Sequence, residues 1–335
     1  MAGPIDVCLT VDVEFSLGSA FSVQGAEPIG DDRVYCRVGG REWGLGFLLK
    51  TFAQYGINAT FFVEALHPNY FGYAPMERAV QKILRAGHDV QLHLHPQWLF
   101  FADPHWRRKT DAGPPNDDLH GRSEDEVVRI IEMGLAAFAR WNAPRPIALR
   151  TGRLRADRAI YRAMARTGIR LSSNIGWGWF QPAEQELRIS AGRAWIEGVL
   201  EAPVMTYRQF ASPPLKPLRL FTVTSTSVAE ARSLLDQAWQ AQISPVVILT
   251  HPFEFVRYFG SISPVTASRI NVGRLEALCR KIANEPERFR SRSFSGAAED
   301  WTVLPALKPD PLRPPAIATA ARLVSNKIND TISWL

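Results

Sequence analysis

Pairs of ionisable side chains, spaced two residues apart, interrupt two apolar stretches of the sequence. Asp12 and Glu14 occur in LTVDVEF, and His93 and His95 occur in DVQLHLHP. Side chains two apart on a β-strand lie on one face, where paired carboxylates repel unless they hold a cation or share a proton. Two histidines and a carboxylate form a common ligand set of catalytic zinc. The pattern therefore predicts a divalent metal site, with solvated acids at a strand end as the alternative.

Two further ionisable residues end apolar stretches. Arg150 ends IALR, and His251 follows VVILT. Burying such groups costs free energy unless they bind something. An arginine can hold a carboxylate through a bidentate pair and fix its orientation and charge state, or it can extend to solvent at the rim of a sheet. A histidine in this position suits acid–base chemistry near neutral pH, or it is a hydrogen-bonded core residue.

The elements that must position these residues follow from the hydrophobic pattern. Apolar runs of about five to eight residues alternate with amphipathic stretches, which is typical of βα units around a parallel sheet. We expect strands at residues 5–14, 59–64, 89–95, 147–151, 169–173, 199–205, 246–251 and 289–294. The four ionisable positions all lie at the carboxyl ends of these strands, so they are expected to meet at one edge of the sheet.

Helix boundaries carry recognisable signals. Ser123 and Ser227 each precede a glutamate by three residues, the spacing of a capping box, and Pro75 stands where a first-turn proline belongs. Gly87 and Gly168 follow helical patterns as stop signals.

Two long polar segments, residues 15–41 and 99–122, follow predicted strands. Segments of this length in a compact domain are usually functional or disordered, and in a barrel they would lie at the carboxyl end of the strands. Several tryptophans occur in or near the loops at strand ends, where they could stack on sugar rings or simply pack. They are Trp98, Trp106, Trp177 and Trp179.

The chain changes character after Trp301. LPALKPDPLRPP is typical of an extended proline-rich linker, and IATAARLVSNKINDTISWL is typical of an amphipathic helix. We therefore expect a main domain at residues 1–298, a linker at 299–315 and a helix at 316–335. Packing against the main domain is the favoured role for this helix, and contact with a partner or a membrane surface is the alternative.

The composition excludes several classes of protein. With 46% hydrophobic residues the chain can bury a large core, and its 39 Lys and Arg against 33 Asp and Glu are scattered without a nucleic-acid-binding motif. Three cysteines without CxxC spacing indicate neither a disulfide framework nor a thiolate zinc site. No signal sequence or spanning segment is evident, so a cytoplasmic location is expected.

At the four strand-end positions the sequence resembles the NodB-homology polysaccharide deacetylases, which are metal-dependent carbohydrate esterases. The similarity covers about residues 5–295, in the family's order along the chain. TVDVE at residues 10–14 resembles the family's TFDD motif, and HLHP, which follows GHD at residues 87–89, resembles its HxxxH motif. Arg150 is similar to the arginine of the third motif, and LTHP, which contains His251, is similar to the fifth.

The resemblance implies an α/β fold of the distorted (β/α)7–8 barrel type and removal of an N-acetyl group from a carbohydrate. The implied ligands of a divalent ion, for which Zn²⁺ is expected, are Glu14, His93 and His95. Asp12 is implied as the general base and His251 as the general acid. Arg150 is implied to keep Asp12 charged and oriented.

Three departures from the family pattern keep other functions open. HxH stands in place of HxxxH, no proline follows Arg150 at the usual spacing, and no aspartate matches the fourth motif near residues 172–179. Hydrolysis of an amide by a metal site is therefore a firmer prediction than deacetylation of a polymer. The alternatives are a small-molecule amidohydrolase and a non-catalytic carbohydrate-binding barrel. A non-haem iron oxygenase uses similar ligands, but its antiparallel double sheet does not fit the βα alternation.

Overall fold

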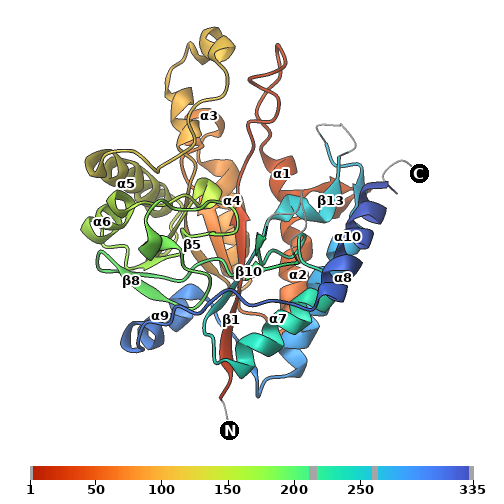
Figure 1. Ribbon diagram of the computed structural model, residues 1–335. Coiled ribbons are helices and arrows are strands. Elements are labelled where there is room, and N and C mark those ends of the chain that lie inside the picture. Colours follow the sequence, from red (N-terminus) through yellow and green to blue (C-terminus); the bar gives the residue numbers. More distant parts are fainter. Residues whose placement is uncertain (1–2, 211–216, 259–262, 332–335) are drawn as a thin grey trace.

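The computed structural model describes residues 3–210, 217–258 and 263–331. Its centre is a nine-stranded sheet with the order β12-β1-β4-β5-β6-β7-β9-β8, and β15 joins it by pairing with β1. The sheet curls into an incomplete barrel, with α5 and α6 on one side and α2, α7 and α8 on the other (Figure 1). The predicted α/β fold with a distorted barrel is confirmed.

The strands follow the predicted apolar runs. The parallel strands are β1 (Ile5–Val13), β4 (Thr60–Glu64), β5 (Asp89–Leu94), β6 (Ala148–Thr151), β7 (Leu171–Ser172), β9 (Val199–Glu201), β12 (Val246–Thr250) and β15 (Phe289–Ser291). An antiparallel strand, β8 (Ala194–Ile196), ends the sheet beside β9. Every residue of β1 is buried, and β1 has paired strands on both sides, β4 on one and β12 and β15 on the other.

Two strands are shorter than the apolar pattern predicts, at 169–173 and 199–205. The buried carboxylate of Glu201 accepts hydrogen bonds from the backbone N–H groups of Asn174 and Ile175, which would otherwise continue the ladder from β7. Beyond β9, the N–H of Val204 donates to Ile175 and the N–H of Met205 donates to Val247. This short segment therefore joins the β7 side of the sheet to β12.

The helices begin and end largely where the sequence signals stand. In α5 (Glu124–Arg140) and α7 (Val228–Gln240), Ser123 and Ser227 form complete capping boxes. Pro75 lies in the first turn of α4 (Ala74–Arg85). The remaining helices of the barrel are α2 (Leu45–Tyr55), α6 (Arg158–Arg166), α8 (Arg269–Asn284) and α9 (Phe294–Val303).

The two long polar segments rise together from the carboxyl end of the strands (Figure 1). The first contains α1 (Asp31–Tyr35), and the second contains two 3-10 turns, η1 (Pro96–Ala102) and η2 (Trp106–Ala112). Phe21 of the first segment packs against Phe100, Phe101 and Trp106 of the second. Trp98 and Trp106 are both buried, so they pack and do not form a sugar platform.

The chain beyond the barrel packs back on it. Helix α9 continues through residue 298, where we placed the end of the main domain, and α10 (Ala316–Thr331) lies against α7. Arg322 of α10 donates from Nε to Glu230 Oε1 of α7 at 3.0 Å, and both side chains are buried. Of the three roles considered for this helix, packing is thus observed for Ala316–Thr331, and residues 332–335 of the predicted helix lie outside the described residues. Among the described residues, no helix has the length and apolar character needed to cross a membrane.

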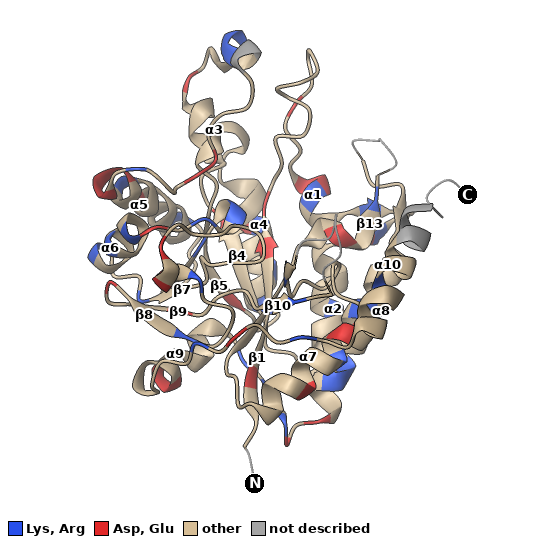
Figure 2. Ribbon diagram, viewed as in Figure 1, with Lys and Arg blue, Asp and Glu red and all other residues tan. Residues whose placement is uncertain are grey.

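Basic and acidic residues are interspersed along the outer helices (Figure 2). On α5 and α6, for example, Arg166 pairs with Glu124 and Asp125, and Arg162 also pairs with Glu124. These arginines are half-exposed, so their ion pairs contribute little to stability. Such alternation of both signs is typical of a solvated helix surface.

Candidate active site

Asp12 lies near the end of β1 and is held by a buried arginine. Arg150 Nη1, from β6, donates to Asp12 Oδ1 at 2.6 Å. The other nitrogens of the guanidinium are occupied, since Nη2 donates to Ser173 Oγ at 2.8 Å and Nε donates to Ser173 O at 3.3 Å. The contact that the sequence predicted is therefore present, but as a single charge-assisted hydrogen bond and not as a bidentate pair. Asp12 Oδ2 remains directed toward the cavity, 3.9 Å from His93 Nε2.

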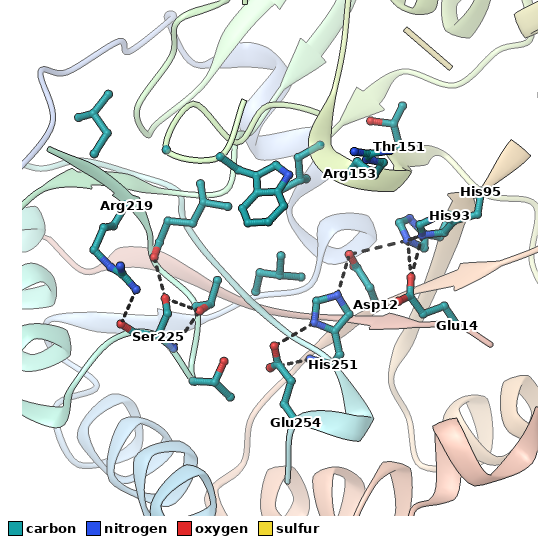
Figure 3. A pocket seen from close by; sticks show the side chains of 18 of the residues that line it. Asp12, Glu14, His93, His95, Thr151, Arg153, Arg219, Ser225, His251 and Glu254 are labelled. Atoms are coloured by element: carbon teal, nitrogen blue, oxygen red, sulfur yellow. Dashed lines mark hydrogen bonds and ion pairs between the residues drawn. The ribbon is translucent and has the colours of Figure 1, made fainter. Parts of the chain in front are cut away.

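The predicted metal ligands converge beside Asp12. Glu14 Oε2 lies 2.8 Å from His95 Nε2 and 3.3 Å from His93 Nε2, and the two Nε2 atoms are 3.0 Å apart (Figure 3). One ligand atom of each residue lies within 4.8 Å of the others. The register explains this geometry, because His93 of β5 pairs with Arg150 of β6 and with Glu64 of β4, next to β1.

The hydrogen bonds of the two histidines suit a cation. His93 Nδ1 donates to the carbonyl of Arg150 at 2.8 Å, and His95 Nδ1 donates to Asp117 Oδ2 at 2.7 Å. With those protons placed on Nδ1, both Nε2 atoms direct lone pairs toward each other and toward the Glu14 carboxylate. Three acceptors that converge in this way need a positive charge between them, and N and O donors suit a divalent ion such as Zn²⁺. The residues therefore fit a metal ion.

The acid–base properties of the cluster lead to the same conclusion. Burial opposes charge on Glu14, but when the Nε2 atoms carry protons as well, the charge of His95 and hydrogen bonds from both histidines hold the pKa of Glu14 well below the usual range. Burial likewise opposes charge on His95, but Asp117 and Glu14 hold its pKa well above the usual range. The cluster thus attracts a proton strongly, and a bound cation would take the place of that proton.

His251 follows β12 and faces Asp12 across the cavity. Its Nε2 lies 3.9 Å from Asp12 Oδ2, and its Nδ1 lies 3.2 Å from Glu254 Oε1. Glu254 lies in η5 (Pro252–Phe255), and its Oε2 accepts hydrogen bonds from the His251 N–H at 3.1 Å and from the Thr250 hydroxyl at 2.7 Å. Although burial favours the neutral ring, the charge of Glu254 raises the pKa of His251 to about 9.

Two residues of the site were missed by the sequence interpretation, Asp117 and Glu254. Glu254 stands three residues after His251 in HPFE, which is a capping-box spacing, so a local signal for it existed. Asp117 lies in a long loop beside a second aspartate, Asp118, and nothing in the sequence separates the two. In the structure Asp117 contacts His95, whereas Asp118 pairs with Arg155 at 2.6 Å.

Gly152, directly after β6, makes room for the imidazole ring of His95. A Cβ atom at this position would lie 2.6 Å from His95 Nδ1. Only a residue without a side chain lets the backbone approach the imidazole so closely.

The site opens into a cavity of about 680 Å³ at the carboxyl end of the strands. Asp12, Glu14, His93, His95 and His251 line it, and Arg150 lies buried behind Asp12. Of the four tryptophans considered for sugar binding, Trp179 lines this cavity, and it is largely exposed. The other lining residues are Thr151, Arg153, Leu154, Gly178, Gln209, Leu218, Arg219, Leu220, Thr222, Thr224, Ser225, Leu249 and Glu254.

Comparison with known proteins shows which fold the chain has. No protein-family model matches the chain, and no curated protein matches it by sequence. A solved structure from Mycobacterium smegmatis, provisionally assigned as a polysaccharide deacetylase, matches 93% of this chain and 96% of its own, with a TM-score of 0.58 and 15% identity. The chain has the polysaccharide deacetylase fold. At this identity the similarity concerns the fold alone.

Other structures with the polysaccharide deacetylase fold align over similar lengths with lower scores. A family 4 carbohydrate esterase from Streptomyces lividans, solved with acetate, matches 92% of this chain and 100% of its own at 14% identity and a TM-score of 0.43. A family 4 pseudoenzyme from Bacillus anthracis matches 86% of this chain and 64% of its own at 10% identity and a TM-score of 0.43.

Proposed function

We propose that this protein is a metal-dependent hydrolase that removes an N-acetyl group from a carbohydrate. Glu14, His93 and His95 converge within 4.8 Å of one another, beside the carboxylate of Asp12. Together with His251, these residues would supply a metal site, a base and an acid in one cavity.

Glu14, His93 and His95 would hold the ion, for which Zn²⁺ is the proposed identity. When bound there, a divalent ion polarises the amide carbonyl and lowers the pKa of a coordinated water. Asp117 fixes the ring orientation of His95, and the Arg150 carbonyl fixes that of His93. Preset rings of this kind strengthen metal binding.

Asp12 acts as the general base. Its Oδ1 is bound to Arg150, so Oδ2 is the atom that accepts the proton of the attacking water. Arg150 keeps the carboxylate in one orientation and, by its charge, balances a carboxylate that would otherwise be buried unpaired. Because Asp12 is committed to Arg150, it does not compete with Glu14 for the ion.

His251 acts as the general acid. Glu254 accepts from Nδ1 and raises the pKa of His251 to about 9, so the ring is protonated at neutral pH. Its Nε2 faces the same space as Asp12 Oδ2. As the C–N bond of the tetrahedral intermediate breaks, His251 Nε2 gives its proton to the departing nitrogen, and the products are an amine and acetate.

Acetate release from N-acetylated oligosaccharides tests the proposal. The wild-type protein loaded with Zn²⁺ should release acetate, and Asp12→Asn should lose at least a hundredfold in kcat while keeping one equivalent of metal. A protein that binds the oligosaccharides but releases no acetate would contradict the proposal and favour a carbohydrate-binding barrel. Release only from small amides would favour a small-molecule amidohydrolase instead.

A further inference from the structure

The two ends of the cavity are lined by different kinds of side chain. Acidic groups and histidines gather around the predicted metal ligands, and Arg219 lies with Ser225 on the opposite side, beyond His251 and Asp12 (Figure 3). Arg153, the other arginine of the lining, lies on the side of His93. Arg219 is therefore the cation of the lining that stands at the end remote from the metal ligands.

Arg219 belongs to a short hairpin whose position is tightly determined. Strand β11 (Leu218–Leu220) pairs with β10 (Thr206–Arg208). The backbone of β11 packs so closely on Gly178 that a Cβ there would lie 2.5 Å from the carbonyl carbon of Arg219. The guanidinium thus projects from a backbone that cannot shift easily.

The hydrogen-bonding capacity of Arg219 is only partly used. Nη2 donates to Ser225 O at 3.2 Å, and Nε is buried without a hydrogen-bond partner. Within the part of the chain that the structure describes, Arg219 forms no ion pair, whereas Arg153 lies 3.8 Å from Asp118. Leu218 and Leu220, which flank Arg219 in β11, also line the cavity. A partly exposed guanidinium with unused donors can bind a carboxylate or a phosphate from the cavity, and the described residues supply no anion that competes for it.

We infer that the substrate carries an anionic group, a carboxylate or a phosphate, which binds Arg219 while the acetamido group lies at Glu14, His93 and His95. This inference rests on the proposed function, because it uses the same cavity for the substrate. A volume of about 680 Å³ suits a small ligand better than a long polymer. Leu154, Leu249 and Trp179 line the cavity and can contact the sugar ring. The substrate class is therefore a small N-acetylated amino sugar with an acidic substituent.

Kinetic comparison of three probes tests the inference. They are methyl N-acetylglucosaminide, which is neutral, N-acetylmuramic acid, which carries a carboxylate, and N-acetylglucosamine 1-phosphate. The wild-type protein should show at least tenfold higher kcat/KM for one of the two anionic probes than for the neutral probe, and the better probe identifies the anion. Arg219→Gln should remove that preference while changing the neutral probe less than threefold, and Arg219→Lys should keep part of it.

Arg145→Gln is the matched control. Arg145 also donates from Nη2 to a backbone carbonyl, that of Thr167, but it does not line the cavity. This variant should keep the anionic preference. Equal kcat/KM for neutral and anionic probes, or equal losses on all three in Arg219→Gln, would overturn the inference and make Arg219 a structural residue.

A binding measurement separates this inference from the proposed function. Calorimetry with glucosamine 1-phosphate and methyl glucosaminide, which lack the acetyl group, needs no hydrolysis. Glucosamine 1-phosphate should bind at least tenfold tighter than methyl glucosaminide, and Arg219→Gln should abolish this difference. That result supports the anion site even if no acetate is ever released. Acetate release without any Arg219-dependent preference supports the hydrolase and overturns the anion site.

Discussion

Arg150 Nη1 lies 2.6 Å from Asp12 Oδ1, and both side chains are buried. The pair joins β6 to β1 across the two strands that lie between them in the sheet, and the same arginine residue offers its backbone carbonyl to His93. One residue therefore orients both the proposed base and a proposed metal ligand. This coupling makes Arg150 a position where stability and activity should change together.

Replacing Arg150 by methionine should destabilise the fold by about 3–5 kcal/mol, because it leaves the carboxylate of Asp12 buried without its partner. Activity should fall at least a hundredfold, because Asp12 loses its orientation. Chemical denaturation and acetate release measure the two effects. The double variant Asp12→Asn/Arg150→Met should regain part of the lost stability and none of the activity. If it is as unstable as Arg150→Met, the charge pair is not the cause.

The pH dependence of kcat should depend on Glu254. His251 must carry a proton to donate it, so activity is present below its pKa and is lost as the pH rises through that value. The wild-type alkaline limb is expected near the pKa of about 9. Glu254→Gln removes the charge that raises this pKa, so the limb should move at least one pH unit lower. Thr250→Val, which removes a hydrogen bond to Glu254 but leaves its charge, should shift it less. An unchanged limb in Glu254→Gln would assign the proton to another group.

Asp117→Asn should weaken metal binding by about 10–100-fold, because His95 loses a charged acceptor at Nδ1. Titration with Zn²⁺ against a competing chelator gives the affinity. Asp118→Asn is the matched control, since this neighbouring acid pairs with Arg155 and does not contact His95. Equal affinities in the two variants would contradict the role given to Asp117.

Gly152→Ala should also weaken metal binding, for a steric reason. The new methyl group would lie 2.6 Å from His95 Nδ1 and displace the ring from Glu14 and His93. Gly273→Ala offers a control, because no atom lies within 4 Å of a Cβ there and the residue is in α8, where alanine is favoured by about 1 kcal/mol. Wild-type zinc affinity in Gly152→Ala would show that His95 does not need its present position.

The sequence was sufficient for features that depend on regular spacing. The two-residue spacing on parallel strands predicted that Asp12, Glu14, His93 and His95 lie at one edge of the sheet, and they do. Features that depend on the path of a loop were not predictable. Asp117 contacts His95 only because a 24-residue segment, 99–122, returns to the site, and the chain offers Asp118 as an equal candidate.

Two further differences have a tertiary origin. Sugar stacking and packing were both open for Trp98, and its ring packs, buried against Phe71 and Phe101. The apolar run at 169–173 predicted a longer strand, but the carboxylate of Glu201, distant in sequence, takes the backbone hydrogen bonds that would extend it. Neither contact can be predicted from the local sequence pattern.

Metal-dependent deacetylation by this site can be measured as acetate release from an N-acetylated oligosaccharide by chelator-treated protein, before and after one equivalent of Zn²⁺ is restored. The wild-type protein should release no acetate before Zn²⁺ is restored and regain full release afterwards, and His93→Ala should not recover. Undiminished release by metal-free protein, or full recovery in His93→Ala, would contradict metal-dependent deacetylation by this site.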